Sequence, residues 1–233
     1  MGWGDPEAAA ALWLTVQVAG TAILFGLPLA IAVSYVLARY RFPGHMLLNG
    51  LVHLPLVMPP VVTGYGLLLL FGPAGPLGRF LNDVFGVGLA FRWTGAALAA
   101  AIMAFPLMVR PIRVAIESVD MGLESAAETL GANRVMVFFT VTLPLALPGI
   151  LAAAILGFAK ALGEFGATIT FVSNIPGETR TLALAIYSLT QSPDGDRAAL
   201  MLAGLAAVLA FSAVIASEVV VRRMQARLSG GRR

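Results

Sequence analysis

Long apolar runs alternate along the chain with short stretches that are rich in proline, glycine or charge. A helix that crosses a bilayer needs about 20 mainly apolar residues, and five runs meet that length. They cover residues 12–38, 47–71, 93–114, 145–171 and 198–221. The pattern therefore predicts an all-α integral membrane protein with about five transmembrane helices. Six is the alternative, because proline-broken helices blur the boundaries.

Proline and charge interrupt two of the predicted spans. The second holds Pro55, Pro59 and Pro60, so we expect it to be kinked or locally unwound. The fourth is interrupted by Lys160 and Glu164. Three segments between the spans are expected to be a loop, a short interfacial piece and a moderately apolar piece near the membrane surface: residues 72–78, 79–88 and 182–189.

The composition supports a membrane protein and excludes several other classes. Hydrophobic residues make up 59% of the 233 residues and charged residues only 12%, with a mean hydropathy of +0.89. A soluble domain needs far more charged surface. The pI near 9.8 does not indicate a nucleic acid partner, because the basic residues do not form one patch. The absence of cysteine excludes disulfides, thiolate metal sites and cysteine catalysis.

The distribution of positive charge predicts the topology. Ten of the fifteen basic residues lie at the ends of the first, third and last spans or after them, four fall on the other side of the membrane, and Lys160 lies within a span. Positive charge gathers in cytoplasmic segments, so we expect the N-terminus outside and the C-terminus inside. The acidic N-terminus lacks the basic region of a secretory signal, so the first span is expected to remain as an anchor. The transmembrane domain is predicted to cover residues 8–221, followed by a basic cytoplasmic tail, residues 222–233.

The polar stretch between the third and fourth spans has a pattern of its own. Gly131 sits where a first short helix would end, because glycine is the usual residue just past a helix end. Residues 120–144 therefore predict a helix, a glycine-centred turn and a second helix. This shape fits a rigid knob for a soluble partner or, as the alternative, an amphipathic helix resting on the membrane. Apolar and small residues recur in it at near-helical spacing: Leu123, Ala126, Ala127, Leu130, Val135 and Phe138.

The same stretch resembles the EAA signature of ABC-importer permeases. That signature is Glu-Ala-Ala, three residues, glycine, nine residues, an aliphatic residue, any residue and Leu-Pro, and its spacing is matched up to Pro144. One position departs, because Ser125 stands where the signature has glutamate and Glu124 comes one place earlier. The resemblance implies a coupling helix that docks into a cleft on a cytoplasmic ATPase. The candidate coupling residues are Glu124, Ala126, Ala127, Thr129, Gly131 and Ala132.

Two further stretches are similar to the molybdate permease subfamily of these importers. They are residues 54–64, Leu-Pro-Leu-Val-Met-Pro-Pro-Val-Val-Thr-Gly, and residues 163–181, which begin with Gly-Glu-Phe-Gly-Ala-Thr. The similarity implies a type I importer fold in the bacterial inner membrane, in contact with membrane lipid. It also implies a second copy of the chain, a cytoplasmic ABC ATPase dimer and an extracytoplasmic molybdate-binding protein. Sulfate permeases share the Gly-Glu-Phe-Gly core, so tungstate and sulfate or thiosulfate importers remain alternatives.

Charged, proline and hydroxyl residues inside the spans are candidates for the transport pathway or its gate. An unpaired charge at the bilayer centre costs about 2.5–3.5 kcal/mol or more. Lys160 and Glu164, four residues apart, therefore either neutralise each other or line the pathway. Broken helices expose backbone N–H groups to a cavity, and with threonine hydroxyls these groups hold an oxyanion; alternatively, the threonines bond their own helix backbones. The candidates are Pro59, Pro60, Thr63, Lys160, Glu164, Thr168 and Thr170.

Glu178 and Arg180 lie in a predicted external loop. They are candidates for docking the binding protein, with solvated loop charges as the alternative. The chain has no Gly-x-x-x-x-Gly-Lys-[Ser/Thr] pattern, so ATP hydrolysis is expected in a partner subunit. We expect no catalytic residue, metal site or cofactor. The rival classes are a stand-alone secondary transporter or membrane enzyme, against which the spacing from Gly131 to Pro144 argues, and an inert anchor, against which the kinked, charged spans argue.

Overall fold

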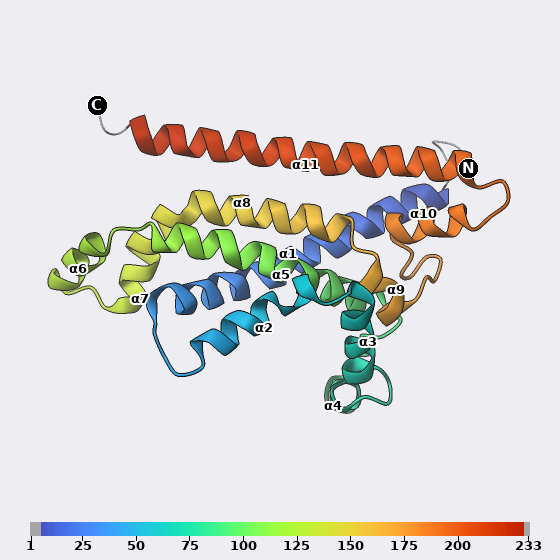
Figure 1. Cartoon of the computed structure of the whole chain (residues 1–233), viewed down its shortest axis with the longest axis horizontal. Helices are drawn as coiled ribbons and strands as arrows, with labels where there is room; N and C mark the ends of the chain where they lie inside the picture. Colours follow the sequence, from blue (N-terminus) through green and yellow to red (C-terminus); the bar gives the residue numbers. More distant parts are fainter. Residues whose placement is uncertain (1–5, 231–233) are drawn as a thin grey trace.

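The computed structural model describes residues 6–230, and every regular element within that range is a helix (Figure 1). The long helices are α1 (Pro6–Arg39), α5 (Trp93–Glu117), α8 (Leu143–Leu162) and α11 (Asp196–Gly230). The short ones are α2 (His45–Val57), α3 (Pro60–Phe71), α4 (Pro76–Phe85), α6 (Met121–Thr129), α7 (Arg134–Val137), the π-helical turn η1 (Phe138–Thr142), α9 (Gly166–Val172) and α10 (Leu182–Thr190). The prediction of an all-α fold is confirmed.

The number of candidate spans agrees with the sequence. Four stretches are long and apolar enough to cross a membrane, and the α2–α3 pair makes a fifth if its halves count as one span. No sixth candidate occurs among residues 6–230. The four are Pro6–Arg39, Trp93–Glu117, Arg134–Leu162 and Asp196–Ala216.

Helices α1, α5 and α8 lie side by side and form the centre of the bundle (Figure 1). Small residues bring their backbones together, because a Cβ added at Gly157 would lie 2.7 Å from Met108 Cγ, and one at Gly149 would lie 2.4 Å from Ala115 Cβ. Membrane helices use such residues where they pack most closely. The buried Ser34 hydroxyl of α1 also donates to the Val109 carbonyl of α5 over 3.0 Å, so one polar bond fixes these two helices in register.

The second predicted span is broken. Helices α2 and α3 meet at an angle of 114°, and α3 projects away from the bundle with α4 at its far end (Figure 1). The break falls at Met58, which is extended with φ −73° and ψ 140°, directly before Pro59 and Pro60. A residue before proline is pushed out of the helical region. Pro55 lies inside α2 without ending it, so the consecutive prolines cause the turn.

The fourth predicted span, residues 145–171, needs correction at both ends. Its helix is continuous from Arg134 to Leu162, through α7, η1 and α8. Leu143-Pro144 does not interrupt it, because the widened π-helical turn that ends at Thr142, directly before Leu143, accommodates a residue that has no N–H to donate. The helix ends at Leu162, and residues 163–165 separate it from α9. The segment predicted as one span therefore contains a second broken helix.

The helix of the last span continues into the predicted tail. Helix α11 runs for 35 residues to Gly230, so residues 222–230 continue it, whereas residues 231–233 lie outside the described range. The stretch after residue 221 contains good helix formers and no proline. The ion pair between Glu218 and Arg222, 2.6 Å apart and four residues apart in sequence, supports the helix across the predicted boundary.

The two ends of the bundle carry different elements. The start of α1 lies beside α10 and the start of α11 at one end (Figure 1). The C-terminal ends of α1 and α11 lie at the opposite end, where α6 projects beyond the other helices (Figure 1). Within the described range, the segments that hold the larger group of basic residues therefore lie at the same end of the bundle.

Candidate functional site

The α6–α7 hairpin, residues 120–144, has the shape that its sequence predicts. Asp120 caps α6 by accepting a hydrogen bond from Gly122 N over 2.8 Å, and Asn133 caps α7 by accepting one from Met136 N over 2.9 Å. Gly131 lies between the two helices with φ +90°, a value that side chains with a Cβ rarely adopt. The predicted helix, glycine turn and second helix are confirmed.

The outer surface of this hairpin presents small and apolar side chains. Ala126, Thr129 and Gly131 are exposed, while Ala127 and Ala132 are half-buried. The Thr129 hydroxyl donates to the Ala126 carbonyl over 2.7 Å, so it satisfies its own helix. The small side chains permit close approach by a complementary groove. The large side chain of Leu130 lies among them and is 89% exposed.

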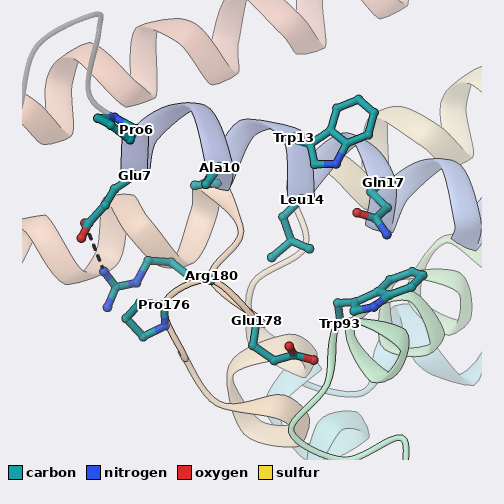
Figure 2. A pocket seen from close by; sticks show the side chains of 12 residues that line it. Pro6, Glu7, Ala10, Trp13, Leu14, Gln17, Trp93, Pro176, Glu178 and Arg180 are labelled. Carbon is teal, nitrogen blue, oxygen red and sulfur yellow. Dashed lines mark ion pairs between the residues drawn. The ribbon is translucent and has the colours of Figure 1, made fainter.

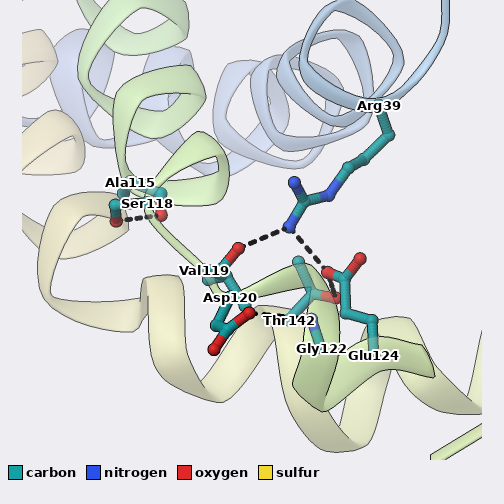
Figure 3. Close-up of polar contacts among 8 residues, drawn as sticks. All are labelled: Arg39, Ala115, Ser118, Val119, Asp120, Gly122, Glu124 and Thr142. Atoms are coloured by element: carbon teal, nitrogen blue, oxygen red, sulfur yellow. Dashed lines mark hydrogen bonds and ion pairs between the residues drawn. The ribbon is translucent and has the colours of Figure 1, made fainter. Parts of the chain in front are cut away.

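Glu124 points away from that surface and into the protein, as Figure 3 shows. Its Oε1 atom accepts from Arg39 Nη2 over 2.8 Å and from Thr142 Oγ1 over 2.7 Å. Glu124 therefore differs from the exposed coupling candidates, because its carboxylate contacts α1 and the π-helical turn. Its role in coupling stays a prediction. Sequence reasoning counted Arg39 only as a charge that sets topology and missed Thr142.

Two helix breaks that are distant in sequence meet in the fold. Helix α3 packs across α9, and a Cβ added at Gly64 would lie 2.4 Å from the Ala167 carbonyl oxygen. A Cβ at Gly166 would lie 2.7 Å from Pro60 Cβ. Backbone therefore touches backbone where the helix that follows Pro59 crosses the helix that follows residues 163–165. The structure brings most of the predicted pathway residues to this crossing.

Lys160 and Glu164 form an ion pair at the second break. Lys160 Nζ lies 2.8 Å from Glu164 Oε2, with the lysine side chain 32% exposed and the glutamate side chain 2% exposed. Glu164 Oε1 also accepts from Ala167 N over 3.1 Å, so the carboxylate satisfies a free N–H in the first turn of α9. Glu164 is not on the helical face shared with Lys160, because α8 ends at Leu162; the pair closes across the helix end instead. The two charges lie close enough to neutralise each other, and their place in the pathway or its gate stays a prediction.

The three candidate threonines have different surroundings. The Thr170 hydroxyl donates to the Gly166 carbonyl over 2.9 Å, which is the helix-bonding alternative. Thr168 is 1% exposed and lies against the core. The Thr63 hydroxyl, one turn into α3, is buried and has no hydrogen-bond partner among residues 6–230. Thr63 is therefore the candidate with a buried hydroxyl that these residues leave unsatisfied.

Glu178 and Arg180 lie at the opposite end of the bundle from α6. They line a pocket of about 440 Å³ between the first turns of α1 and the loop after α9, together with Trp13 and Trp93 (Figure 2). Arg180 Nη1 lies 3.8 Å from Glu7, and its Nε donates to Asn174 Oδ1 over 3.1 Å. The second contact lies within the loop, and the first reaches α1 through a side chain of Glu7 that is 61% exposed. Docking of the binding protein at these residues stays a prediction.

Comparisons with known proteins agree with this arrangement. Residues 22–226 match the family described as "binding-protein-dependent transport system inner membrane component". The molybdenum transport system permease protein ModB of Escherichia coli strain K12 is 55% identical over 218 residues, 94% of this chain and 95% of that protein. ModB of Haemophilus influenzae is 51% identical over 221 residues, 95% of this chain and 96% of that protein. The sulfate transport system permease protein CysT of Salmonella typhimurium is 36% identical over 190 residues, 82% of this chain and 68% of that protein.

Solved structures with low sequence identity share the fold. A bacterial ABC transporter that imports the acidic polysaccharide alginate matches with a TM-score of 0.74 at 18% identity, over 95% of this chain and 81% of that chain. The MetNI methionine ABC transporter, in an inward-facing conformation, matches with a TM-score of 0.70 at 18% identity, over 92% of this chain and 94% of that chain. The predicted importer fold is confirmed. Since the family model covers most of the chain and its relatives reach 55% identity over nearly their whole length, this multi-pass membrane protein belongs to the binding-protein-dependent transport system inner membrane components, the permease subunits of ABC importers.

Proposed function

We propose that this chain is the permease subunit that forms the transmembrane pathway for molybdate uptake. The observation that carries the proposal is the 55% identity to a molybdenum transport system permease over 94% of the chain. The fold alone does not indicate the cargo, because many unrelated functions share one fold. The proposed cargo therefore depends on this relative.

The working assembly contains two copies of this chain, two cytoplasmic ATPase subunits and an extracytoplasmic molybdate-binding protein. The family description, which names dependence on a binding protein, supports the external partner. The absence of a phosphate-binding Gly-x-x-x-x-Gly-Lys-[Ser/Thr] pattern from the sequence supports an ATPase on a separate chain.

The end of the bundle that carries α6 faces the cytoplasm in this proposal. The excess of arginine in the segments at that end supports the orientation, because cytoplasmic segments of membrane proteins are enriched in lysine and arginine. The start of α1 and the pocket beside Arg180 then face outside, where the binding protein docks. A reporter that is active only in the cytoplasm is expected to give a signal when it is fused after Arg233. A signal from a reporter that is active only outside would overturn the orientation.

Coupling begins at the α6–α7 hairpin. ATP closes the ATPase dimer and moves the two hairpins, and the pore changes from an inward-facing to an outward-facing state. The unbroken helix from Arg134 to Leu162 joins the hairpin directly to the Lys160–Glu164 pair. A displacement of α7 therefore reaches the crossing of α3 and α9 along one rigid element. The binding protein releases molybdate into the open pathway, and hydrolysis resets the assembly.

The crossing of α3 and α9 is the proposed gate region. The Glu164 carboxylate is paired with Lys160 there, so its charge repels an oxyanion less than a free carboxylate would. The unpartnered Thr63 hydroxyl is one polar group that a passing oxyanion can use. These weak contacts suit a pathway from which the ion must also depart, and they leave selection to the binding protein.

Two rival functions make different predictions. A permease for tungstate, sulfate or thiosulfate belongs to the same class, and a sulfate permease is 36% identical over 82% of this chain. A stand-alone secondary transporter belongs to another class, and it would carry no ATPase through purification in detergent. Co-purification of an ATPase with this chain separates the second rival.

The experiment that tests the function is uptake of labelled molybdate into vesicles that contain the assembled transporter. We expect excess unlabelled molybdate to abolish the signal and sulfate to compete much less. Stronger competition by sulfate would reassign the cargo.

The absence of cysteine from the chain gives a direct test of docking. A single cysteine at the 89%-exposed position Leu130 is expected to react with a maleimide in the isolated permease and to be protected when the ATPase is bound. A cysteine at exposed Ser192, in the loop before α11 and outside the candidate spans, is the control. Equal labelling of Leu130→Cys with and without the ATPase would contradict docking at this surface.

A further inference from the structure

We propose that Arg39 and Glu124 form an internal clamp that positions the α6–α7 hairpin and carries its displacement to α1. The inference rests on the proposed coupling function and adds two positioning residues to it. The clamp is separate from the docking surface, because its side chains point into the protein (Figure 3).

One guanidinium group holds two parts of the hairpin. Arg39 is the last residue of α1, where a positive charge is favoured by the helix dipole. Its Nη2 atom donates to Glu124 Oε1 over 2.8 Å and to the Val119 carbonyl over 3.2 Å. Val119 precedes the Asp120 cap, so the same atom contacts the entry to α6 and the first turn of α6.

The carboxylate extends the clamp to a third segment. Glu124 Oε1 also accepts from Thr142 Oγ1 over 2.7 Å, and Thr142 is fully buried at the end of the π-helical turn. Thr142 belongs to the continuous helix that ends at Leu162. Glu124 therefore ties α6 both to α1 and to the helix that leads to the gate region.

Burial distinguishes this pair from the other ion pairs at the same end. The side chains of Arg39 and Glu124 are 11% and 15% exposed, whereas those of Arg113 and Glu117 are 25% and 43% exposed. Exposed pairs contribute little, but removal of one partner from a buried pair leaves an uncompensated charge. The Arg39–Glu124 pair also joins residues 85 positions apart, while Arg113 and Glu117 lie on one helix.

A simple mechanical consequence follows from these contacts. Helix α6 has nine residues and none of them is buried, so little apolar packing holds it in place. Without the clamp, α6 is tethered mainly through the turns at its two ends. An ATPase that pulls on it then moves α6 alone and leaves α1 and α8 behind. With the clamp intact, the three elements move together.

The experiment compares uptake with ATP hydrolysis in the full transporter. Arg39→Ala, Glu124→Ala and the double variant are each assembled with the ATPase and the binding protein. We expect molybdate taken up per ATP hydrolysed to fall about tenfold in all three, because they break one shared coupling element. Glu124→Gln, which keeps an oxygen for Thr142, is expected to recover part of the ratio. Glu117→Ala, in the exposed pair, is the matched control.

Three outcomes would overturn the clamp. The first is an unchanged uptake per ATP in Glu124→Ala. The second is a parallel fall of uptake, ATP hydrolysis and assembled transporter, which indicates a structural role alone. The third is a double variant whose loss is the product of the two single losses, which shows that Arg39 and Glu124 act independently.

A failure of the proposed function is recognised separately. If the wild-type transporter takes up no molybdate, tungstate or sulfate, the cargo proposal fails. The clamp is then tested by ATP hydrolysis alone, since an intact clamp is expected to let the binding protein stimulate the ATPase. Stimulation that is as strong in Glu124→Ala as in the wild type would contradict it.

Discussion

Glu124 and Glu164 are both largely buried, but their partners come from different parts of the chain. Glu124, at the hairpin end, is held by partners from two other elements, and its cation is 85 residues away in sequence. Glu164 is held by a cation four residues away and by the N–H of Ala167, three residues on. The first carboxylate joins separate elements, while the second shapes one break in the chain. Burial alone therefore does not tell whether a charged residue transmits motion or fixes local geometry.

The largest effect is expected at the crossing near Glu164. Gly64→Val places a Cβ 2.4 Å from the Ala167 carbonyl oxygen, which belongs to backbone and cannot rotate away. We expect α3 and α9 to separate and molybdate uptake to be lost. Overpacking of this kind costs about 1–3 kcal/mol or more. Uptake and protein yield in membranes are the measurements.

Gly66→Val is the matched control for that substitution. It carries the same helix-propensity cost in the same helix, but a Cβ at Gly66 meets nothing within 4 Å. A Gly66 variant as inactive as the Gly64 variant would show that the close crossing is not the cause.

The second largest effect separates the two roles of Glu164. Glu164→Gln keeps an oxygen that accepts from Ala167 N but leaves Lys160 without its counter-charge. We expect uptake to fall about tenfold while assembly with the ATPase is retained, because an unpaired charge within the membrane is costly. Glu218→Gln removes a carboxylate from an exposed pair with the same spacing, whose side chains are 76% and 60% exposed, and should leave uptake unchanged. Normal uptake in Glu164→Gln would show that Glu164 only caps the start of α9 and that its charge is not needed for transport.

The hairpin could be predicted from sequence because its determinants are local. The capping residues Asp120 and Asn133 and the turn residue Gly131 act within a few positions, and a short window reveals them. The crossing could not be predicted in the same way. Pro59 and Pro60 predicted a break in the second span. The sequence around Gly64 does not reveal that Ala167 packs against this glycine.

The same reasoning explains the missed clamp and the misplaced boundaries. The contact between Arg39 and Glu124 depends on where two chain segments meet, which hydropathy does not encode. The end of α8 at Leu162 was hidden because apolar residues resume after Glu164, so a window of span length runs across the helix end. Apolar length predicts that a segment is in the membrane, but it does not predict where a helix bends inside it.

A smaller effect is expected at the turn of the hairpin. Gly131→Ala forces a Cβ into a backbone with φ +90° and costs about 1–2 kcal/mol. The turn is expected to distort, so that ATP hydrolysis continues while molybdate uptake falls. Gly44→Ala introduces similar strain at φ +95° in the turn before α2, outside the hairpin, and is the control. An equal loss of coupling in both variants would show that any strained turn at this end has the same effect.

The smallest effect is expected at Thr63, in the helix that follows the first break. Thr63→Val removes a buried hydroxyl that has no partner, so the free energy of unfolding should not fall and the amount of folded protein should stay unchanged or rise. If a passing oxyanion uses this hydroxyl, the KM for molybdate uptake rises a few-fold, because a typical hydrogen bond contributes about 0.5–1.5 kcal/mol net. Thr170→Val is the comparison, because its hydroxyl already donates to the Gly166 carbonyl and its loss should not change the KM. Equal KM values in both variants would exclude Thr63 from the pathway and leave backbone N–H groups as the polar lining of the crossing.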